Sequence, residues 1–136
     1  MPPEETRADI VRQGYESFNR GDLEGVVAIC DPAVVCVLPE GGINTGTLEG
    51  HGGVREFLSH YLDAFESLRF DVERLVDADD RIVAYVRMSG RGRGSGLDVN
   101  ASPAHVWTVE GGKVTRVEVF PGGGKGALDA LGLSGA

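Results

Sequence analysis

The sequence lacks the features that several classes of protein require. It contains only two cysteines, Cys30 and Cys36, too few for the disulfide framework of a small secreted domain. No apolar run approaches the roughly 20 residues that a membrane-spanning helix needs. Its 13 lysines and arginines against 21 aspartates and glutamates give a net charge of −8. This balance argues against nucleic acid or an anionic membrane as the main partner, because both require a basic surface.

The first ten residues, MPPEETRADI, are acidic and polar and lack the apolar core of a signal peptide. We therefore expect a cytoplasmic protein with reduced thiols. A length of 136 residues is typical of one domain, residues 1–136, and is enough for a packed core. Glycine is frequent, with 21 residues, and much of it lies in clusters that are typical of turns.

Apolar spacing predicts three helices in the first half of the chain. The first spans residues 6–19 and ends before Gly21. The second is short, follows the N-cap residue Asp22 and ends at Pro32. The third begins near "GHGG" and carries the clearest apolar stripe, formed by Val54, Phe57, Leu58, Tyr61 and Phe65. A last short helix is predicted for "ALDALG", residues 127–132.

The remaining segments have the pattern of strands. "AVVCVL" and "INTGTL" form a predicted pair between the second and third helices. Four strands follow the third helix, each joined to the next by a turn: "LRFDVERLVD", "RIVAYVRMSGR", "LDVNASPAHVWTV" and "KVTRVEVF". The order ααββαββββα indicates an α+β fold with an antiparallel sheet rather than a parallel doubly wound one.

The segment "AHVWTV" points a histidine toward the interior. Alternation places His105, Trp107 and Val109 on one face of the strand and Thr108 and Glu110 on the other. The neighbouring strand has its own apolar face, formed by Ile82, Ala84, Val86 and Met88. A strongly bent sheet with helices against its apolar face encloses a cone. We therefore expect His105 and Trp107 on the inner wall of that cone.

Several blocks of the sequence resemble one known family over residues 8 to 133. The blocks are "YESFNRGDLEGVVAICDP", "GHGGVREFL", "RGRGSG…AHVWTVEGGKVTRVEVF" and "ALDALGL". They resemble the SnoaL-like branch of the nuclear transport factor 2 superfamily. The resemblance implies a curved antiparallel sheet wrapped around a long helix, a conical apolar pocket, and a homodimer. Relatives in the superfamily include ketosteroid isomerase, polyketide cyclases, limonene epoxide hydrolase-like enzymes and non-catalytic domains, so function must be argued from the site.

The first two helices are similar to those of ketosteroid isomerase, which uses a carboxylate base, a tyrosine and a protonated carboxylic acid. The base position falls on Val37 or Leu38, and neither can take a proton. The tyrosine position falls on Gly14, with Tyr15 one residue along the helix, and the acid position falls on His105. Two of the three groups are missing, which argues against steroid isomerase chemistry.

His105 is the strongest candidate for a catalytic residue, because a neutral imidazole can donate one hydrogen bond and accept another. Tyr15 is the second predicted catalytic residue, as a secondary hydrogen-bond donor. Trp107 is expected to form an aromatic wall against a flat ligand. The predicted substrate-binding residues are Trp107, Val37, Phe57, Tyr61, Val86, Met88, Val117 and Val119.

Each candidate has a structural alternative. His105 can be a packed histidine bonded to a neighbour, and Tyr15 can serve helix-to-sheet packing alone. Cys36 lines the pocket in one register of the first strand and faces outward in the other, which leaves a Cys36–His105 pair open. Glu40 and Asp98 are acids near the expected pocket mouth, where solvation or a dimer contact is the alternative. No HxH or HExxH spacing occurs, so we predict neither a metal nor a cofactor.

The pattern as a whole predicts a protein that binds a mid-sized hydrophobic small molecule in a conical apolar pocket. Cofactor-free acid/base isomerisation, cyclisation or epoxide opening is the chemistry that such a site would support. The alternative is a non-catalytic ligand-binding or protein-partner domain, and the sequence leaves open whether the protein is an enzyme. We expect a homodimer through the outer face of the sheet, which carries Tyr85, Arg87, Arg91, Arg116 and Glu118.

Overall fold

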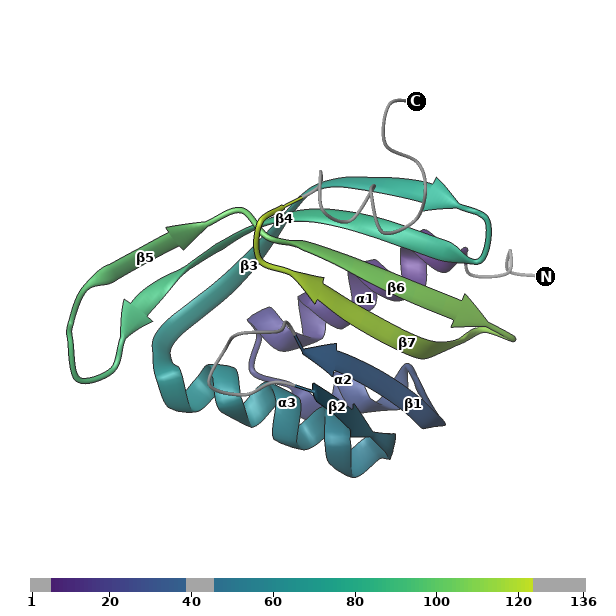
Figure 1. Ribbon diagram of the computed structural model, residues 1–136, viewed down its shortest axis with the longest axis horizontal. Coiled ribbons are helices and arrows are strands. Elements are labelled where there is room, and N and C mark those ends of the chain that lie inside the picture. The colour runs from purple at the N-terminus through teal and green to yellow at the C-terminus, as the bar shows by residue number, and fades with distance from the viewer. Residues whose placement is uncertain (1–5, 39–45, 124–136) are drawn as a thin grey trace.

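The chain forms helices and strands around one curved sheet, as seen in a computed structural model that describes residues 6–38 and 46–123 (Figure 1). The helices are α1 (Arg7–Asn19), α2 (Leu23–Ala28) and α3 (Gly50–Ala64). The strands are β1 (Cys30–Leu38), β2 (Gly46–Glu49), β3 (Phe65–Ala78), β4 (Arg81–Gly92), β5 (Asp98–Ala101), β6 (Ala104–Glu110) and β7 (Lys113–Phe120).

Local side chains fix the ends of the first two helices. Thr6 accepts a hydrogen bond from the Asp9 amide at 3.0 Å, and Asp9 accepts one from the Thr6 amide at 3.2 Å. This reciprocal pair is a capping box that begins α1. Gly21 has φ +81°, which only glycine adopts easily, and it turns the chain after α1. Asp22 then caps α2 by accepting from the Gly25 amide at 2.9 Å.

The strands form one sheet in the order β2-β1-β7-β6-β4-β3, with β5 paired to β4. The predicted α+β fold with a curved sheet is confirmed. The sheet is mixed rather than purely antiparallel, because β1 runs parallel to β7 while the other neighbours are antiparallel. The hairpin with β6 fixes the direction of β7, and β1 meets β7 in that same direction.

Two predicted boundaries near β1 and α3 were wrong. The second helix ends at Ala28, and Pro32 lies within β1 instead of stopping a helix. The pairing of β1 with β7 is irregular between Cys30 and Val35, so the missing amide proton of Pro32 interrupts no regular ladder. Phe65 begins β3 rather than completing the stripe of α3.

The strand predicted for residues 97–109 is divided into β5 and β6 at Ser102 and Pro103. Proline has no amide proton to donate to a ladder, which favours a break at this point. The Pro103 carbonyl still accepts a hydrogen bond from the Val86 amide at 3.3 Å, so the two halves stay aligned along β4. Within the described residues, five strands therefore follow α3, not four. The helix predicted for residues 127–132 lies outside the described residues.

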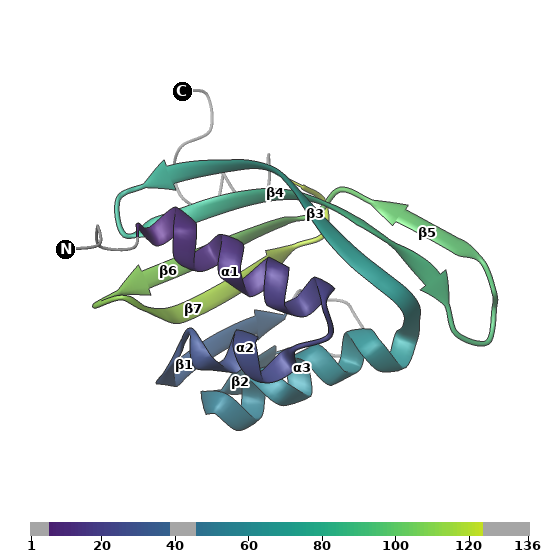
Figure 2. The ribbon, with the colours of Figure 1, turned by 180° about the vertical axis from the view of Figure 1, so that it is seen from behind.

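The main apolar core lies between the helices and the inner face of the sheet. Figure 2 shows α1 crossing the concave side of the sheet, with α2 and α3 beside β1 and β2. Fully buried members of this core are Ile82, Val11, Val34, Val86, Val109, Val114 and Cys36. A smaller cluster on the other face of the sheet contains Val83, Ala104 and Val106. None of the described helices is long and apolar enough to cross a membrane.

Candidate functional site

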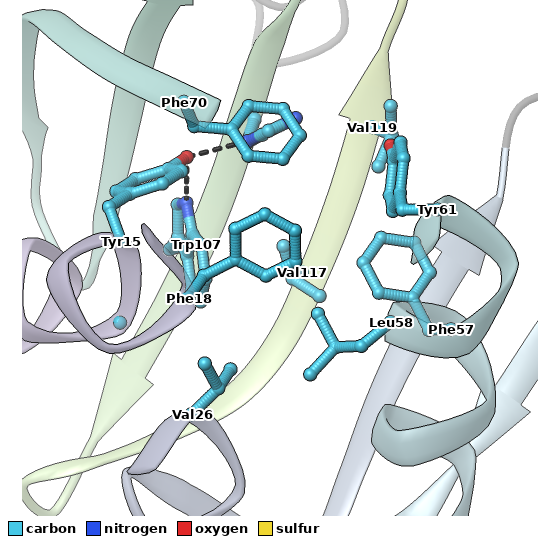
Figure 3. A pocket seen from close by; sticks show the side chains of 12 residues that line it. Tyr15, Phe18, Val26, Phe57, Leu58, Tyr61, Phe70, Trp107, Val117 and Val119 are labelled. Carbon is cyan, nitrogen blue, oxygen red and sulfur yellow. Dashed lines mark hydrogen bonds between the residues drawn. The ribbon is translucent and has the colours of Figure 1, made fainter. Parts of the chain in front are cut away.

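A pocket lies between the helices and the inner face of β3, β6 and β7 (Figure 3). Its volume is about 40 Å³, so the pocket has room for only a few waters. The lining residues are Gly14, Tyr15, Phe18, Val26, Phe57, Leu58, Tyr61, Phe70, His105, Trp107, Val117 and Val119.

Gly14 lies where α1 packs against Ile29 and the Trp107 ring. A Cβ atom at Gly14 would lie 2.9 Å from Ile29 Cδ1 and 3.6 Å from Trp107 Cη2. The first distance would require only the flexible end of the Ile29 side chain to shift, and the second is an ordinary van der Waals contact. Tyr15, the next residue of α1, lies within hydrogen-bonding distance of His105 and Trp107 of β6.

Two hydrogen bonds meet at the Tyr15 hydroxyl (Figure 3). Trp107 Nε1–H donates to Tyr15 Oη at 3.0 Å, and Tyr15 Oη lies 2.6 Å from His105 Nδ1. The Tyr15 hydroxyl proton therefore has His105 Nδ1 as its acceptor. That assignment places the imidazole proton on Nε2, because a neutral imidazole carries one proton. His105 Nε2 is buried and has no hydrogen-bond partner within the described residues.

Burial keeps both members of this pair neutral. Desolvation lowers the pKa of His105 from 6.5 to about 4, so the imidazole is uncharged at neutral pH. Burial also raises the pKa of the Tyr15 hydroxyl far above its usual 10.0, against the smaller opposing effect of the Trp107 hydrogen bond. The site therefore presents a neutral N–H donor in apolar surroundings, where a hydrogen bond is stronger than in water.

Phe70 packs against His105 and against two other aromatic rings of the pocket lining. Its ring centroid lies 5.6 Å from that of His105, 5.6 Å from that of Tyr61 and 5.2 Å from that of Phe18. The Asn19 side chain fixes the Phe70 backbone, since it donates to the Phe70 carbonyl at 2.8 Å and accepts from the Phe70 amide at 2.9 Å. β3 ends the sheet order, so Asn19 supplies partners to backbone groups on the open edge of that strand.

The structure brings most of the predicted site residues together. His105 and Trp107 extend from β6, Val117 and Val119 from β7, and Tyr15 from α1. Phe57 and Tyr61, predicted on the stripe of the third helix, complete the lining from α3. Tyr15 differs from its predicted role in one respect. Its hydroxyl is already engaged by His105 and Trp107.

Three predicted lining residues do not line the pocket. Val37 is half-buried and lies on the face of β1 opposite the buried Val34 and Cys36. Val86 and Met88 are on the expected inner face of β4, but they pack into the core beyond the pocket. Phe70 of β3 pairs directly with Met88, and it is the Phe70 ring that reaches the pocket.

Five pocket residues were missed by sequence reasoning: Gly14, Phe18, Val26, Leu58 and Phe70. Helical spacing was a usable signal for two of them, because Phe18 follows Tyr15 by three positions and Leu58 precedes Tyr61 by three. The predicted strand pattern gave no signal for Phe70, because the position of its ring depends on how far β3 curves toward α1.

The remaining candidates lie outside the site or have structural partners. Cys36 is 1% exposed and faces inward, which settles its register, but it belongs to the core, and burial raises its thiol pKa to about 11. His51 bonds to the Cys30 carbonyl at 2.9 Å. The Asp98 side chain is 85% exposed and lies 3.5 Å from Arg91. No group of potential metal ligands occurs in the described parts of the chain, and Glu40 lies outside them.

The sequence profile of the SnoaL-like domain matches residues 11–117. The chain belongs to the SnoaL-like domain family. The resemblance noted from the sequence is therefore confirmed, and the match covers every lining residue of the pocket except Val119. A comparison with curated proteins finds no match to this SnoaL-like chain.

Solved structures share the fold of this SnoaL-like domain. TerC, co-crystallised with polyporic acid, is 28% identical with a TM-score of 0.76, over 91% of this chain and 95% of that one. An NTF2-like protein of unknown function from Burkholderia pseudomallei K96243 is 26% identical with a TM-score of 0.78, over 98% and 100%. A protein with a ketosteroid isomerase-like fold from Catenulispora acidiphila DSM 44928, in complex with trimethylamine, is 14% identical with a TM-score of 0.75, over 94% and 95%.

The outer face of this SnoaL-like domain carries paired charges. The Arg74 guanidinium lies over the Tyr85 ring, 5.4 Å from its centroid. Arg116 and Glu118 form an ion pair at 3.1 Å. Both contacts join neighbouring side chains of this chain. They order the outer face of the sheet but do not identify a binding partner for it.

Proposed function

We propose that this SnoaL-like domain binds a small, mainly apolar molecule that carries an oxygen acceptor, and that His105 Nε2–H donates a hydrogen bond to that oxygen. The observation that carries the proposal is the buried, unpartnered Nε2 of a histidine in the pocket lining. A buried donor without a partner costs roughly 1–3 kcal/mol. A ligand that supplies an acceptor would recover this free energy on binding.

The size and polarity of the pocket narrow the ligand class. A volume of about 40 Å³ favours a ligand smaller than the mid-sized metabolite predicted from sequence, or one that displaces Phe57 and Tyr61 as it enters. No Lys, Arg, Asp or Glu side chain lines the pocket in the described residues, which favours an uncharged ligand. The ligands named for TerC and for the Catenulispora protein support small-molecule binding by this fold.

The test uses two ligands of matched shape, cyclohexanone and the hydrocarbon methylenecyclohexane. Trp107 is the only tryptophan of the chain, so its indole N–H gives a single NMR signal next to the pocket. Following that signal in a titration, we expect the ketone to bind about 3- to 10-fold more tightly than the hydrocarbon, as one hydrogen bond allows.

The His105→Leu variant should bind both ligands equally, because leucine keeps apolar bulk and removes the donor. A ketone preference that survives in His105→Leu would overturn the proposal. So would a wild-type protein that binds the two ligands with the same affinity.

A second candidate function is cofactor-free catalysis at the same carbonyl. Trp107 donates to Tyr15, and Tyr15 donates to His105, which would donate to the ligand oxygen. Such a chain of donors would stabilise negative charge that develops on that oxygen. Proton exchange beside a ketone is the simplest such reaction. We expect wild type to accelerate deuterium uptake into cyclohexanone above the buffer rate, and His105→Leu to lose that acceleration. Uptake at the buffer rate with intact binding would favour the non-catalytic alternative.

The predicted homodimer through the outer face stays a proposal. Tyr85 and the neighbouring charged side chains of β4 and β7 are the surface it would use. Light scattering should give twice the mass of 14.4 kDa for wild type. A Tyr85→Glu variant should lower it toward the single chain, and a monomeric wild type would exclude the dimer.

A further inference from the structure

Tyr61 supplies a second free polar atom to the pocket. The polar atoms of Tyr15 and Trp107 are engaged with each other and with His105. Tyr61 lines the pocket from α3, is half-buried, and its hydroxyl makes no hydrogen bond with the described residues. Two side-chain polar atoms of the described lining are therefore without a hydrogen-bond partner: His105 Nε2 and Tyr61 Oη.

Both groups border the same part of the pocket. The rings of His105 and Tyr61 each lie 5.6 Å from the Phe70 ring, at interplanar angles of 66° and 87°. Val119 is the direct cross-strand partner of His105, so the two side chains are neighbours on one face of the sheet. Tyr61 and Val119 both line the pocket, and they lie on the same side of it in the view of Figure 3. The two polar groups thus flank a short apolar surface formed by Phe70 and Val119.

We infer that Tyr61 is a specificity-determining residue and that the ligand carries polar groups at two positions: an acceptor for His105 and a second oxygen, as hydroxyl or carbonyl, for Tyr61. This inference rests on the proposed function and extends it from a ketone-like ligand to a compact hydroxyketone or diketone. Burial raises the pKa of Tyr61 to about 12, so its hydroxyl stays protonated and can both donate and accept. If Tyr61 served only to pack against Phe57 and Phe70, a second oxygen on the ligand would not change its affinity.

The test compares cyclohexanone with the three positional isomers of hydroxycyclohexanone, because the isomers place the second oxygen at different distances from the first. Binding is followed through the Trp107 indole signal in wild type, Tyr61→Phe and His105→Leu. We expect one isomer to bind wild type about 3- to 10-fold more tightly than cyclohexanone, the gain that one added hydrogen bond provides. Tyr61→Phe should abolish that gain, measured within each protein as the ratio of the isomer's affinity to that of cyclohexanone.

The outcomes separate the two proposals. If no isomer exceeds cyclohexanone, or if Tyr61→Phe keeps the gain, the role of Tyr61 is overturned, while a loss of cyclohexanone affinity in His105→Leu still supports the proposed function. If His105→Leu binds cyclohexanone as wild type does, or if no ketone binds wild type, the proposed function fails and the inference fails with it. Because phenylalanine preserves the ring contacts, Tyr61→Phe should fold, and its melting temperature checks this directly.

Discussion

Strands β6 and β1 both turn alternate side chains toward the interior, but only β6 builds the site. On β6 the inward residues are His105 and Trp107, exposed by 6% and 7%. On β1 they are Val34 and Cys36, exposed by 0% and 1%. Burial is therefore nearly equal, and it does not separate site from core. What separates them is the buried Nε2 of His105, which no neighbour satisfies.

The position of each strand in the sheet explains the difference. β6 lies at the centre, between β4 and β7, and faces α1 across the pocket. β1 lies beside the short edge strand β2, and α3 packs against this end of the sheet (Figure 1). Side chains from α3 fill the space in front of β1, so a polar residue there would meet packed apolar neighbours. The position that holds a base in ketosteroid isomerase falls on this strand, at Val37 or Leu38, and neither residue can accept a proton.

The largest expected effect comes from placing a carboxylate on β1. Cys36→Asp changes the residue volume little but buries an unpaired carboxylate among apolar side chains. We expect a loss of about 3–5 kcal/mol in the free energy of unfolding, measured by urea denaturation at pH 7. Val37→Asp is the matched control, since Val37 is half-buried on the opposite face, and it should cost about 1 kcal/mol. Equal losses in the two variants would contradict the assigned register of β1.

The second prediction concerns pH and tests the buried imidazole of β6. The pKa of His105 is about 4 in the folded protein, below its ordinary value of 6.5, because burial disfavours the charged form. The unfolded chain therefore binds more protons between these values, and stability must fall as the pH decreases from about 6.5 toward 4. The contribution reaches roughly 3 kcal/mol at most, at about 1.4 kcal/mol for each pH unit.

His105→Leu isolates this contribution. It retains His51, His60 and every carboxylate, so the difference in unfolding free energy between wild type and variant, measured from pH 7.5 to 4.5, reports His105 alone. Parallel pH profiles for the two proteins would mean that the imidazole is not held neutral by burial.

The third prediction concerns the hydrogen-bond chain from Trp107 through Tyr15 to His105, with its middle residue replaced. Tyr15→Phe leaves the Trp107 N–H and His105 Nδ1 without their shared partner, which should destabilise the fold by about 1–3 kcal/mol. Tyr61→Phe is the matched control, since its hydroxyl has no partner among the described residues, and it should change stability by less than about 0.5 kcal/mol. Histidine ¹⁵N NMR should show the proton on Nε2 in wild type and a mixture of tautomers in Tyr15→Phe. An unchanged tautomer would contradict the hydrogen-bond assignment.

The sequence predicted the fold more fully than the site. Helix caps, apolar stripes and alternating strands are local signals, and they located α1, α3 and the later strands to within a few residues. The strand around Pro32 was misjudged because it depends on pairing with the distant strand β7, whereas the division at Pro103 had a local signal in the proline itself. Likewise, the parallel pairing of β1 with β7 joins segments about 80 residues apart and leaves no local trace.

Within the site, the sequence located His105 and Trp107 because alternation alone fixes the face of a strand. It could not show that Tyr15 reaches His105, since that contact joins α1 to a strand 90 residues away along the chain. Nor could it separate Val117 from Val86, because both lie on inner faces and only the curvature of the sheet decides which one reaches the pocket.

The smallest effect we predict distinguishes those two valines. Val117→Ala should widen the pocket, so that cycloheptanone, with one methylene more than cyclohexanone, gains about 4-fold in relative affinity. Val86→Ala removes the same atoms from a residue that is 1% exposed and lies away from the pocket. It should leave the ratio of the two affinities unchanged while lowering the melting temperature. A similar change of ring-size preference in both variants would place Val86 on the wall of the pocket, and the sequence prediction for that residue would then be correct.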